Sequence, residues 1–158
     1  MLARIQAHGA SVDALKAYGL PDIPETEQFY AGGNAEFLKA ASSAAHVYGR
    51  RLVSAESFVY AGKGYQSTPA SLERDANRLI AAGINEIIYH GFLYVYMDRP
   101  EPDWFPFVPP VSFSDHFNPH NTIWAAVPRL NAYITRLQYI SQNGRPEERY
   151  GEYRPELD

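Results

Sequence analysis

The sequence contains no cysteine, so neither a disulfide nor a thiolate metal site can contribute to its structure. No apolar run approaches the roughly 20 residues that a membrane-spanning helix needs, and the first twenty residues lack the apolar core of a signal peptide. Positive charge is also scarce: the net charge is −4, and Arg50-Arg51 is the only adjacent basic pair. We therefore expect neither a membrane nor a nucleic acid as a partner.

A glycine-rich phosphate loop is missing too. The nearest candidate, Gly62-Lys63-Gly64, does not have the spacing of a nucleotide-binding fingerprint, which weighs against a doubly wound dinucleotide-binding fold. What the 158 residues do contain is a hydrophobic fraction of 46% and an aromatic fraction of 14%, dominated by 12 Tyr and 8 Phe. This composition is typical of one globular domain with a real core.

Strand-like and helix-like stretches alternate along the chain. Asn34 and the pair Thr68-Pro69 are typical helix starts, and Gly83 is a typical stop. Pro21 and Pro24 have no backbone N–H to donate, so the second strand-like stretch can join a regular central ladder only after Pro24. The expected strands are 3–9, 21–30, 51–58 and 84–91, and the expected helices are 11–18, 34–49, 68–83 and 122–143.

Four strand–helix units in succession predict a parallel sheet with right-handed crossovers. Because a closed (β/α)8 barrel needs eight units, we predict an α/β fold that forms part of a TIM barrel, with about four units. The barrel region should span residues 1–143, and a polar tail should span residues 144–158. Pro128 should start or kink the last helix, whose inner side is expected to carry Leu130, Tyr133, Ile134, Leu137 and Ile140.

Glu56 is the centre of the functional hypothesis. It stands near the exit of the apolar stretch 51–58, and burying an unpaired carboxylate would cost several kcal/mol. We therefore place it at the carboxyl end of the strand, where binding groups gather in parallel barrels. The alternative is a structural ion pair with Arg50 or Arg51. Glu27, at the end of the preceding strand, is either a second site carboxylate or a surface residue in a proline-rich turn.

His8 and His90 each precede a glycine at the end of a strand-like stretch. A histidine there can hydrogen-bond sugar hydroxyls or hold a carboxylate in position, and the alternative is a half-buried histidine satisfied by a backbone carbonyl. His46 lies near a helix C-terminus, where the helix dipole favours a cation, so we expect a structural role for it.

The segment 92–121 is long, aromatic and rich in proline, and a loop of this length in a compact domain is usually functional. Trp104, and Trp124 just beyond the segment, could stack on a sugar ring; the alternative is that these aromatics seal a helix over the sheet. The polar residues expected to take sugar hydroxyls are His116, His120 and Asn121. The two histidines are four residues apart but off any helix, so we do not expect a zinc site.

Six short motifs occur in a fixed order along most of the chain. They are Gln6-Ala7-His8-Gly9, Asp22-Ile23-Pro24-Glu25-Thr26-Glu27, Ala44-Ala45-His46-Val47-Tyr48-Gly49, Ser54-Ala55-Glu56-Ser57-Phe58, Gly83-Ile84-Asn85 with Tyr89-His90-Gly91, and Asn118-Pro119-His120-Asn121 ahead of Trp124. In this order and spacing they resemble the catalytic barrel of glycoside hydrolase family 106, the α-L-rhamnosidases and their relatives.

This resemblance implies an inverting, calcium-assisted hydrolysis of a terminal rhamnoside, or a similar deoxysugar, in a plant or microbial glycan. Glu56 looks like one essential glutamate of that family, and Glu27 looks like a second, either catalytic or bound to the metal. The family's earlier barrel half, which supplies further site glutamates, has no counterpart here, and Gln28 separates Glu27 from Phe29 where the family usually has Glu-Phe. The chain thus resembles the carboxyl-side half of such a barrel, and the resemblance suggests a periplasmic or extracellular location for a full-length member.

Three functional hypotheses follow. The first is a segment of a glycoside hydrolase whose carbohydrate substrate meets Glu56 and Glu27, with little activity on its own. The second is a carbohydrate-binding remnant without catalysis, and the third is a structural piece that folds only with a partner. Half a barrel would leave two strand edges unpaired and an apolar face lined by Ile5, Val53 and Ile87, so we expect self-association or docking to the missing half.

Overall fold

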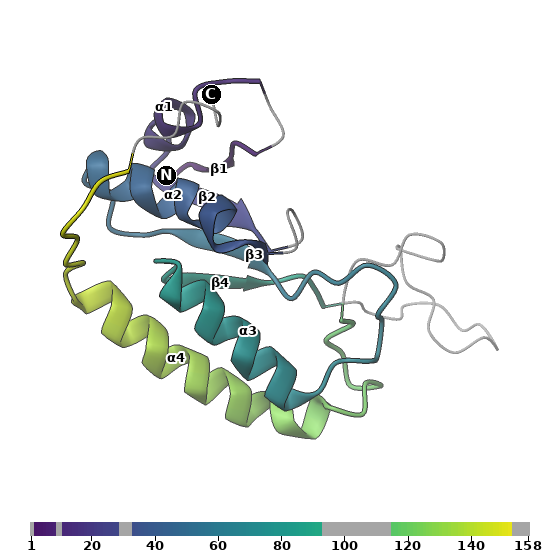
Figure 1. The fold of residues 1–158 in the computed structure, drawn as a ribbon. Coiled ribbons are helices and arrows are strands. Elements are labelled where there is room, and N and C mark those ends of the chain that lie inside the picture. Colours follow the sequence, from purple (N-terminus) through teal and green to yellow (C-terminus); the bar gives the residue numbers. More distant parts are fainter. Residues whose placement is uncertain (1, 9–10, 29–32, 93–114, 153–158) are drawn as a thin grey trace.

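Four parallel strands form a single sheet in the order β1-β2-β3-β4, and helices follow the strands (Figure 1). This open α/β sheet confirms the predicted fold class. The computed structural model describes residues 2–8, 11–28, 33–92 and 115–152. No helix within these ranges is long and apolar enough to cross a membrane. The elements are β1 (Arg4–Gln6), α1 (Ala14–Gly19), β2 (Ile23–Glu27), α2 (Ala35–Val47), β3 (Ser54–Ser57), α3 (Pro69–Ala81), β4 (Glu86–Tyr89), the 3-10 helix η2 (Trp124–Ala126) and α4 (Val127–Asn143).

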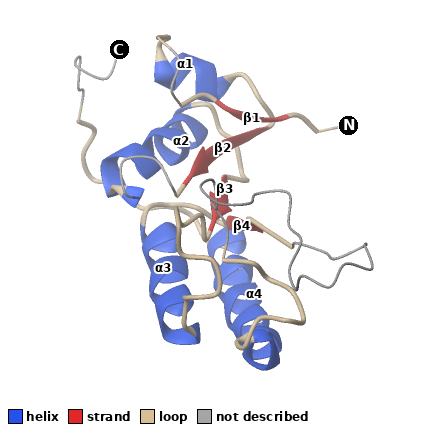
Figure 2. Cartoon of the chain, turned by 90° about the vertical axis from the view of Figure 1, so that its right-hand side faces the viewer, coloured by secondary structure: helices blue, strands red, loops and turns tan. Residues whose placement is uncertain are grey.

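The hydrophobic core lies between the sheet and the helices, which wrap around one face of it (Figure 2). Val53 and Ile87 belong to this core and are at most 9% exposed. The expectation that they line an open apolar face is therefore wrong, because strand alternation turns them toward the helices, whereas Ile5 is exposed. The same alternation turns polar side chains to the opposite face, called the inner face below: Arg4, Gln6, Glu25, Glu27, Ser54, Glu56 and Glu86.

Capping residues set the starts of the helices. The Asn34 side chain accepts a hydrogen bond from a backbone N–H in the first turn of α2, and Thr68 forms a capping box with Ser71 at the start of α3. Both starts confirm the prediction. The first helix starts later than the predicted range 11–18, because its N-cap is Asp13.

The central strand β2 accommodates a proline. Its ladder with β3 begins at the pair Glu25–Ser54, one residue after Pro24, so the missing N–H is not needed on that side. This agrees with the prediction that a regular ladder begins only after Pro24. On the side of β1 the strand includes Pro24, and the backbone N–H of Ile23 donates to the carbonyl of Ala3 at 3.0 Å.

The helix α4 starts with Pro128 in its first turn, as predicted. Its predicted inner side is wrong at Ile140, which is 67% exposed. Glutamines take the inner positions in the last turns: Gln138 Oε1 accepts from the N–H of Ile87 at 2.6 Å, and Gln142 Nε2 donates to the carbonyl of the residue before β4 at 2.7 Å. The β4 edge is therefore partly satisfied by side chains and is not the fully unpaired edge that was expected.

Gly83→Ala is expected to lower the free energy of unfolding by about 2–4 kcal/mol. Gly83 has a φ of +87°, and a Cβ there would lie 2.7 Å from the Cβ of Ser42. Gly62→Ala is the matched control, because Gly62 has a φ of +65° but nothing within 4 Å of the added Cβ. The control should lose only the backbone contribution, about 1 kcal/mol. Urea denaturation measures both, and equal losses would contradict the steric part of the account.

Candidate active site

The register of the sheet places Glu27 and Glu56 side by side. They are direct partners in the β2–β3 ladder; Glu27 ends β2, and Glu56 lies one residue before the end of β3. The backbone N–H of Gln28 donates to the carbonyl of Glu56 at 3.0 Å, so the strands remain joined just beyond the pair. Both carboxylates therefore belong to the inner face at the carboxyl end of the sheet, where the sites of parallel barrels form.

A histidine contacts each carboxylate from the outer side of the pair. His8 Nε2 lies 3.2 Å from Glu27 Oε2, and His90 Nε2 lies 3.4 Å from Glu56 Oε1. His8 follows β1 and His90 follows β4, so the contacts reach across the ends of all four strands. We call His8, Glu27, Glu56 and His90 the strand-end row. The structure thus brings together the four residues that the sequence placed at strand ends.

The contacts do not support two of the alternative interpretations. The side-chain contacts of Glu56 are with Gln6 and His90, not with Arg50 or Arg51, and Arg50 donates to the carbonyl of Gly19 at 3.0 Å. The Glu27 side chain is 13% exposed, so it is not a surface residue. His46 has the structural contact expected of it, since its Nδ1 lies 2.6 Å from Oε1 of Glu148 in the polar tail.

Two members of the strand-end row, Glu27 and His8, have shifted pKa values. Burial, and next the charge of Glu56, raise the pKa of Glu27 from 4.5 to about 7. Burial lowers the pKa of His8, against the opposing influence of Glu56 and Glu25. Both shifts favour the neutral form of the side chain, so Glu27 keeps a proton up to about pH 7, where an ordinary carboxyl group is ionised, and His8 is neutral there. The row therefore offers a carboxylic acid beside a second carboxyl group.

Two inner-face residues that were not predicted as site residues, Gln6 and Glu25, support the strand-end row. Gln6 Nε2 donates to Glu56 Oε2 at 2.8 Å and to Glu25 Oε1 at 3.1 Å. The two-residue period of a strand could have revealed them. Gln6 precedes His8 by two positions and Glu25 precedes Glu27 by two, so each shares a face with a member of the row.

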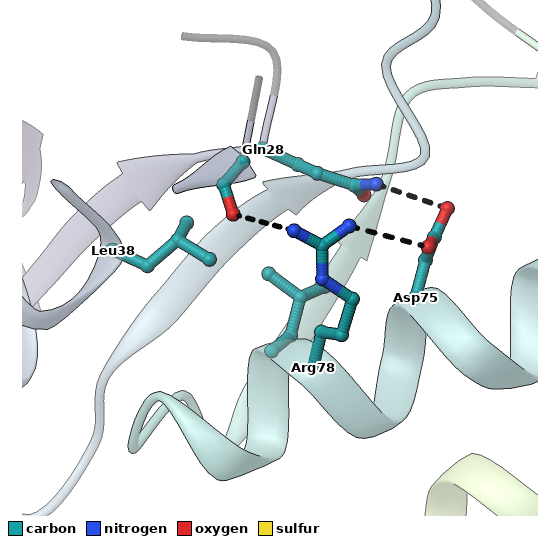
Figure 3. Close-up of a pocket in the computed structure, with 6 residues that line it drawn as sticks. Gln28, Leu38, Asp75 and Arg78 are labelled. Atoms are coloured by element: carbon teal, nitrogen blue, oxygen red, sulfur yellow. Dashed lines mark hydrogen bonds and ion pairs between the residues drawn. The ribbon is translucent and has the colours of Figure 1, made fainter. Parts of the chain in front are cut away.

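Next to the row, Gln28 ties the ends of β2 and β3 to α3. Its Oε1 accepts from the N–H of Phe58 at 2.7 Å. Figure 3 shows its other contact, in which Nε2 donates to Asp75 Oδ2 at 3.3 Å. Asp75 also accepts from the hydroxyl of Tyr60 at 2.5 Å and lies 4.0 Å from Arg78 Nη1. The cavity beside these residues measures about 10 Å³, which is room for about one water molecule and none for a sugar. This cluster is therefore a structural support.

The remaining sugar-binding candidates follow β4, and two of them are buried polar residues. Asn121 is buried, and its Nδ2 donates to two backbone carbonyls at 2.8 and 3.1 Å, which is the role of a turn-forming residue. His116 is buried as well. Trp124 is half-buried against the core and His120 is exposed. Trp104 lies outside the described residues. Contact of these residues with a sugar stays a prediction.

Comparison with known proteins identifies the family. The sequence model of glycoside hydrolase family 106, alpha-L-rhamnosidase, matches residues 14–148. A protein of Formosa agariphila named "Putative beta-glucuronidase" is 33% identical over 146 residues, which cover 89% of this chain and 12% of that protein. The solved structure of a rhamnosidase from Novosphingobium sp. PP1Y matches with a TM-score of 0.65 and 26% identity, over 83% of this chain and 13% of that one. The chain thus spans about an eighth of the length of either relative, and it belongs to glycoside hydrolase family 106.

Proposed function

We propose that this chain forms part of the active site of a glycoside hydrolase that cleaves a terminal α-L-rhamnoside or a related deoxysugar. The observation that carries the proposal is the pairing of Glu27 with Glu56 across neighbouring strand ends, with a raised pKa on Glu27. Glycoside hydrolysis needs one carboxylic acid and one carboxylate at the scissile bond. Membership of family 106 supports the same chemistry.

In the proposed reaction Glu27 is the general acid and Glu56 is the general base. The carboxyl proton of Glu27 passes to the glycosidic oxygen as its bond to the anomeric carbon breaks. Glu56 takes a proton from the water whose oxygen attacks that carbon. The products are the free sugar and the alcohol, and return of the proton from Glu56 to Glu27 through solvent completes the cycle. His8 and His90 orient the two carboxyl groups.

The contacts of the row favour an inverting mechanism. An inverting pair of carboxyl groups is about 6.5–9.5 Å apart, to leave room for the water, whereas neighbouring strands are only about 4.8 Å apart. An inverting pair on neighbouring strands therefore requires that the two side chains diverge. Their histidine partners lie on opposite sides, with His8 beyond β1 and His90 beyond β4, which favours such divergence. The anomeric configuration of the first-formed sugar, followed by proton NMR, tests this part of the proposal.

Calcium is implied by the family resemblance alone. Calcium binds several oxygen ligands, and carboxylates are prominent among them. Across the described ranges, however, no three histidine, aspartate or glutamate side chains lie close enough together to hold a metal ion. We therefore assign no residue of the described ranges to calcium and no step of the reaction to it.

The charges on the inner face favour a neutral sugar over a uronic acid. A glucuronide carries a carboxylate that needs a cation, and Arg4 is already paired with Glu25 at 3.2 Å and with Glu86 at 2.8 Å. Further carboxylates at Glu27 and Glu56 would repel an anionic sugar when ionised. We expect an α-L-rhamnoside to be preferred to the corresponding β-D-glucuronide.

The test combines binding and turnover. L-rhamnose is titrated into ¹⁵N-labelled chain, and hydrolysis of aryl α-L-rhamnoside and aryl β-D-glucuronide is followed by release of the phenol. We expect chemical-shift changes in the amide resonances of the strand-end row, and faster release of the phenol from the rhamnoside than from the glucuronide. The assays are run on the chain alone and with the other barrel segments of a family 106 rhamnosidase added. Binding of L-rhamnose without turnover in both cases would support the carbohydrate-binding alternative. Faster release from the glucuronide would contradict the proposed substrate class.

A further inference from the structure

We propose that Gln6 is a positioning residue that holds the Glu56 carboxylate within the strand-end row. This inference rests on the proposed function of the row and adds a residue that acts through Glu56 and not on the substrate. It follows from the contacts of the Gln6 side chain, which reaches from β1 across β2 to a carboxylate on β3.

The amide of Gln6 can take only one orientation. Its Nε2 lies 2.8 Å from Glu56 Oε2 and 3.1 Å from Glu25 Oε1, so each of its two hydrogens faces a carboxylate. Rotation of the amide by half a turn would bring its oxygen, which only accepts hydrogen bonds, against two acceptors. The donor is therefore fixed by the chemistry of its partners.

The second acceptor, Glu25, is itself held in place. Ser54 Oγ donates to Glu25 Oε2 at 2.7 Å, and Arg4 Nε lies 3.2 Å from the same oxygen. Arg4 Nη2 also binds Glu86 Oε1 at 2.8 Å. These contacts link side chains of all four strands, and Gln6 is the residue that connects them to the row.

Glu56 would move without this anchor. Gln6 binds its Oε2 and His90 lies 3.4 Å from its Oε1, so the two oxygens are held from different sides. The side chain is 28% exposed and has carboxyl groups as neighbours, which would drive a free carboxylate toward water. Among the residues that the structure describes, the titratable and charged groups that face Glu56 are Glu25 and Glu27 from β2, His8 after β1, and His90 after β4.

The test is the titration of Glu27, whose pKa responds to the position of Glu56. Gln6→Met keeps the length of the side chain and removes both donors. We expect the ¹³C carboxyl resonance of Glu27 to titrate at about pH 7 in the wild-type chain, and about one pH unit lower in Gln6→Met, because Glu56 retreats. Gln142→Met is the matched control: that glutamine donates to the carbonyl of Asn85 at 2.7 Å, and its loss should leave the Glu27 midpoint unchanged.

The outcomes separate the inference from the proposed function. An unchanged Glu27 midpoint in folded Gln6→Met, judged by its amide spectrum, would overturn the role of Gln6 and leave the row intact. A wild-type midpoint near 4.5 would overturn the proposed function, and the role of Gln6 with it. If Gln6→Met does not fold, Gln6→Asn replaces it, since its amide is one methylene too short to reach both carboxylates. A lower midpoint in that variant supports the inference, and an unchanged one refutes it.

Discussion

Glu56→Gln is expected to reduce kcat/KM for an α-L-rhamnoside by a factor of about 10²–10⁴, because an amide cannot take a proton from the attacking water. This factor corresponds to about 3–5 kcal/mol of lost transition-state stabilisation. The fold should persist, since the side chain is 28% exposed and the amide oxygen can still accept from Gln6. The measurement is kcat/KM of the wild-type chain and the variant, each alone and with the other barrel segments of a family 106 rhamnosidase. Circular dichroism checks that the variant keeps its fold.

Glu27→Gln is the comparison that separates acid from base. A dinitrophenol leaves without help from an acid, whereas methanol needs its oxygen protonated. Loss of the general acid should therefore be severe with methyl α-L-rhamnoside and mild with the dinitrophenyl glycoside. Loss of Glu56, the base, should be similar with both. The opposite pattern would exchange the two roles, and no loss in either variant would exclude the pair from catalysis.

The second large effect is on the pH dependence of stability, through Glu27. Its pKa is about 7 in the folded chain and 4.5 as an ordinary carboxyl. Between these values the folded chain binds more protons than the unfolded chain, so this stabilisation is complete below about pH 4.5 and is lost as the pH rises through about 7. After allowance for solvent screening, the loss should be about 2 kcal/mol at pH 8.

Glu27→Gln removes that loss, because a neutral amide does not ionise. We expect the variant to match the wild-type chain near pH 4.5 and to exceed its free energy of unfolding by about 2 kcal/mol at pH 8. His8 acts in the opposite sense, since its lowered pKa reduces stability as the pH falls. The difference between the two chains, measured by urea denaturation from pH 4 to pH 8.5, therefore isolates Glu27. Parallel curves would contradict the raised pKa.

Strand ends could be predicted from the sequence because each carries a polar residue after an apolar run. In a parallel sheet the carboxyl ends of neighbouring strands meet at one edge. That rule was sufficient to place Glu27 beside Glu56 and a histidine at either side, as the register and the contacts show. The helix starts at Asn34 and Thr68 were predictable for a comparable reason, since a cap depends on only a few adjacent residues.

The face that each strand residue takes was harder to predict. A shift of one residue exchanges the two faces of a strand, so Val53 and Ile87 were assigned to the open side although they pack under the helices. Gln6 was overlooked because its partners lie 19 and 50 residues away in the sequence. Ile140 was misplaced because the inner side of α4 meets a strand edge there, and a backbone N–H needs an acceptor such as Gln138 more than it needs an apolar side chain.

The most direct test of the account is the ¹³C titration of the Glu27 carboxyl group in the wild-type chain and in Glu56→Gln, with Glu27→Gln used to assign the resonance. A pair of coupled carboxyl groups predicts a wild-type midpoint at about pH 7. Removal of the neighbouring charge should lower that midpoint by about one pH unit, and burial should keep it above 4.5. A wild-type midpoint of 4.5, or one that does not move when Glu56 becomes an amide, would contradict the central claim that the two carboxyl groups form one site.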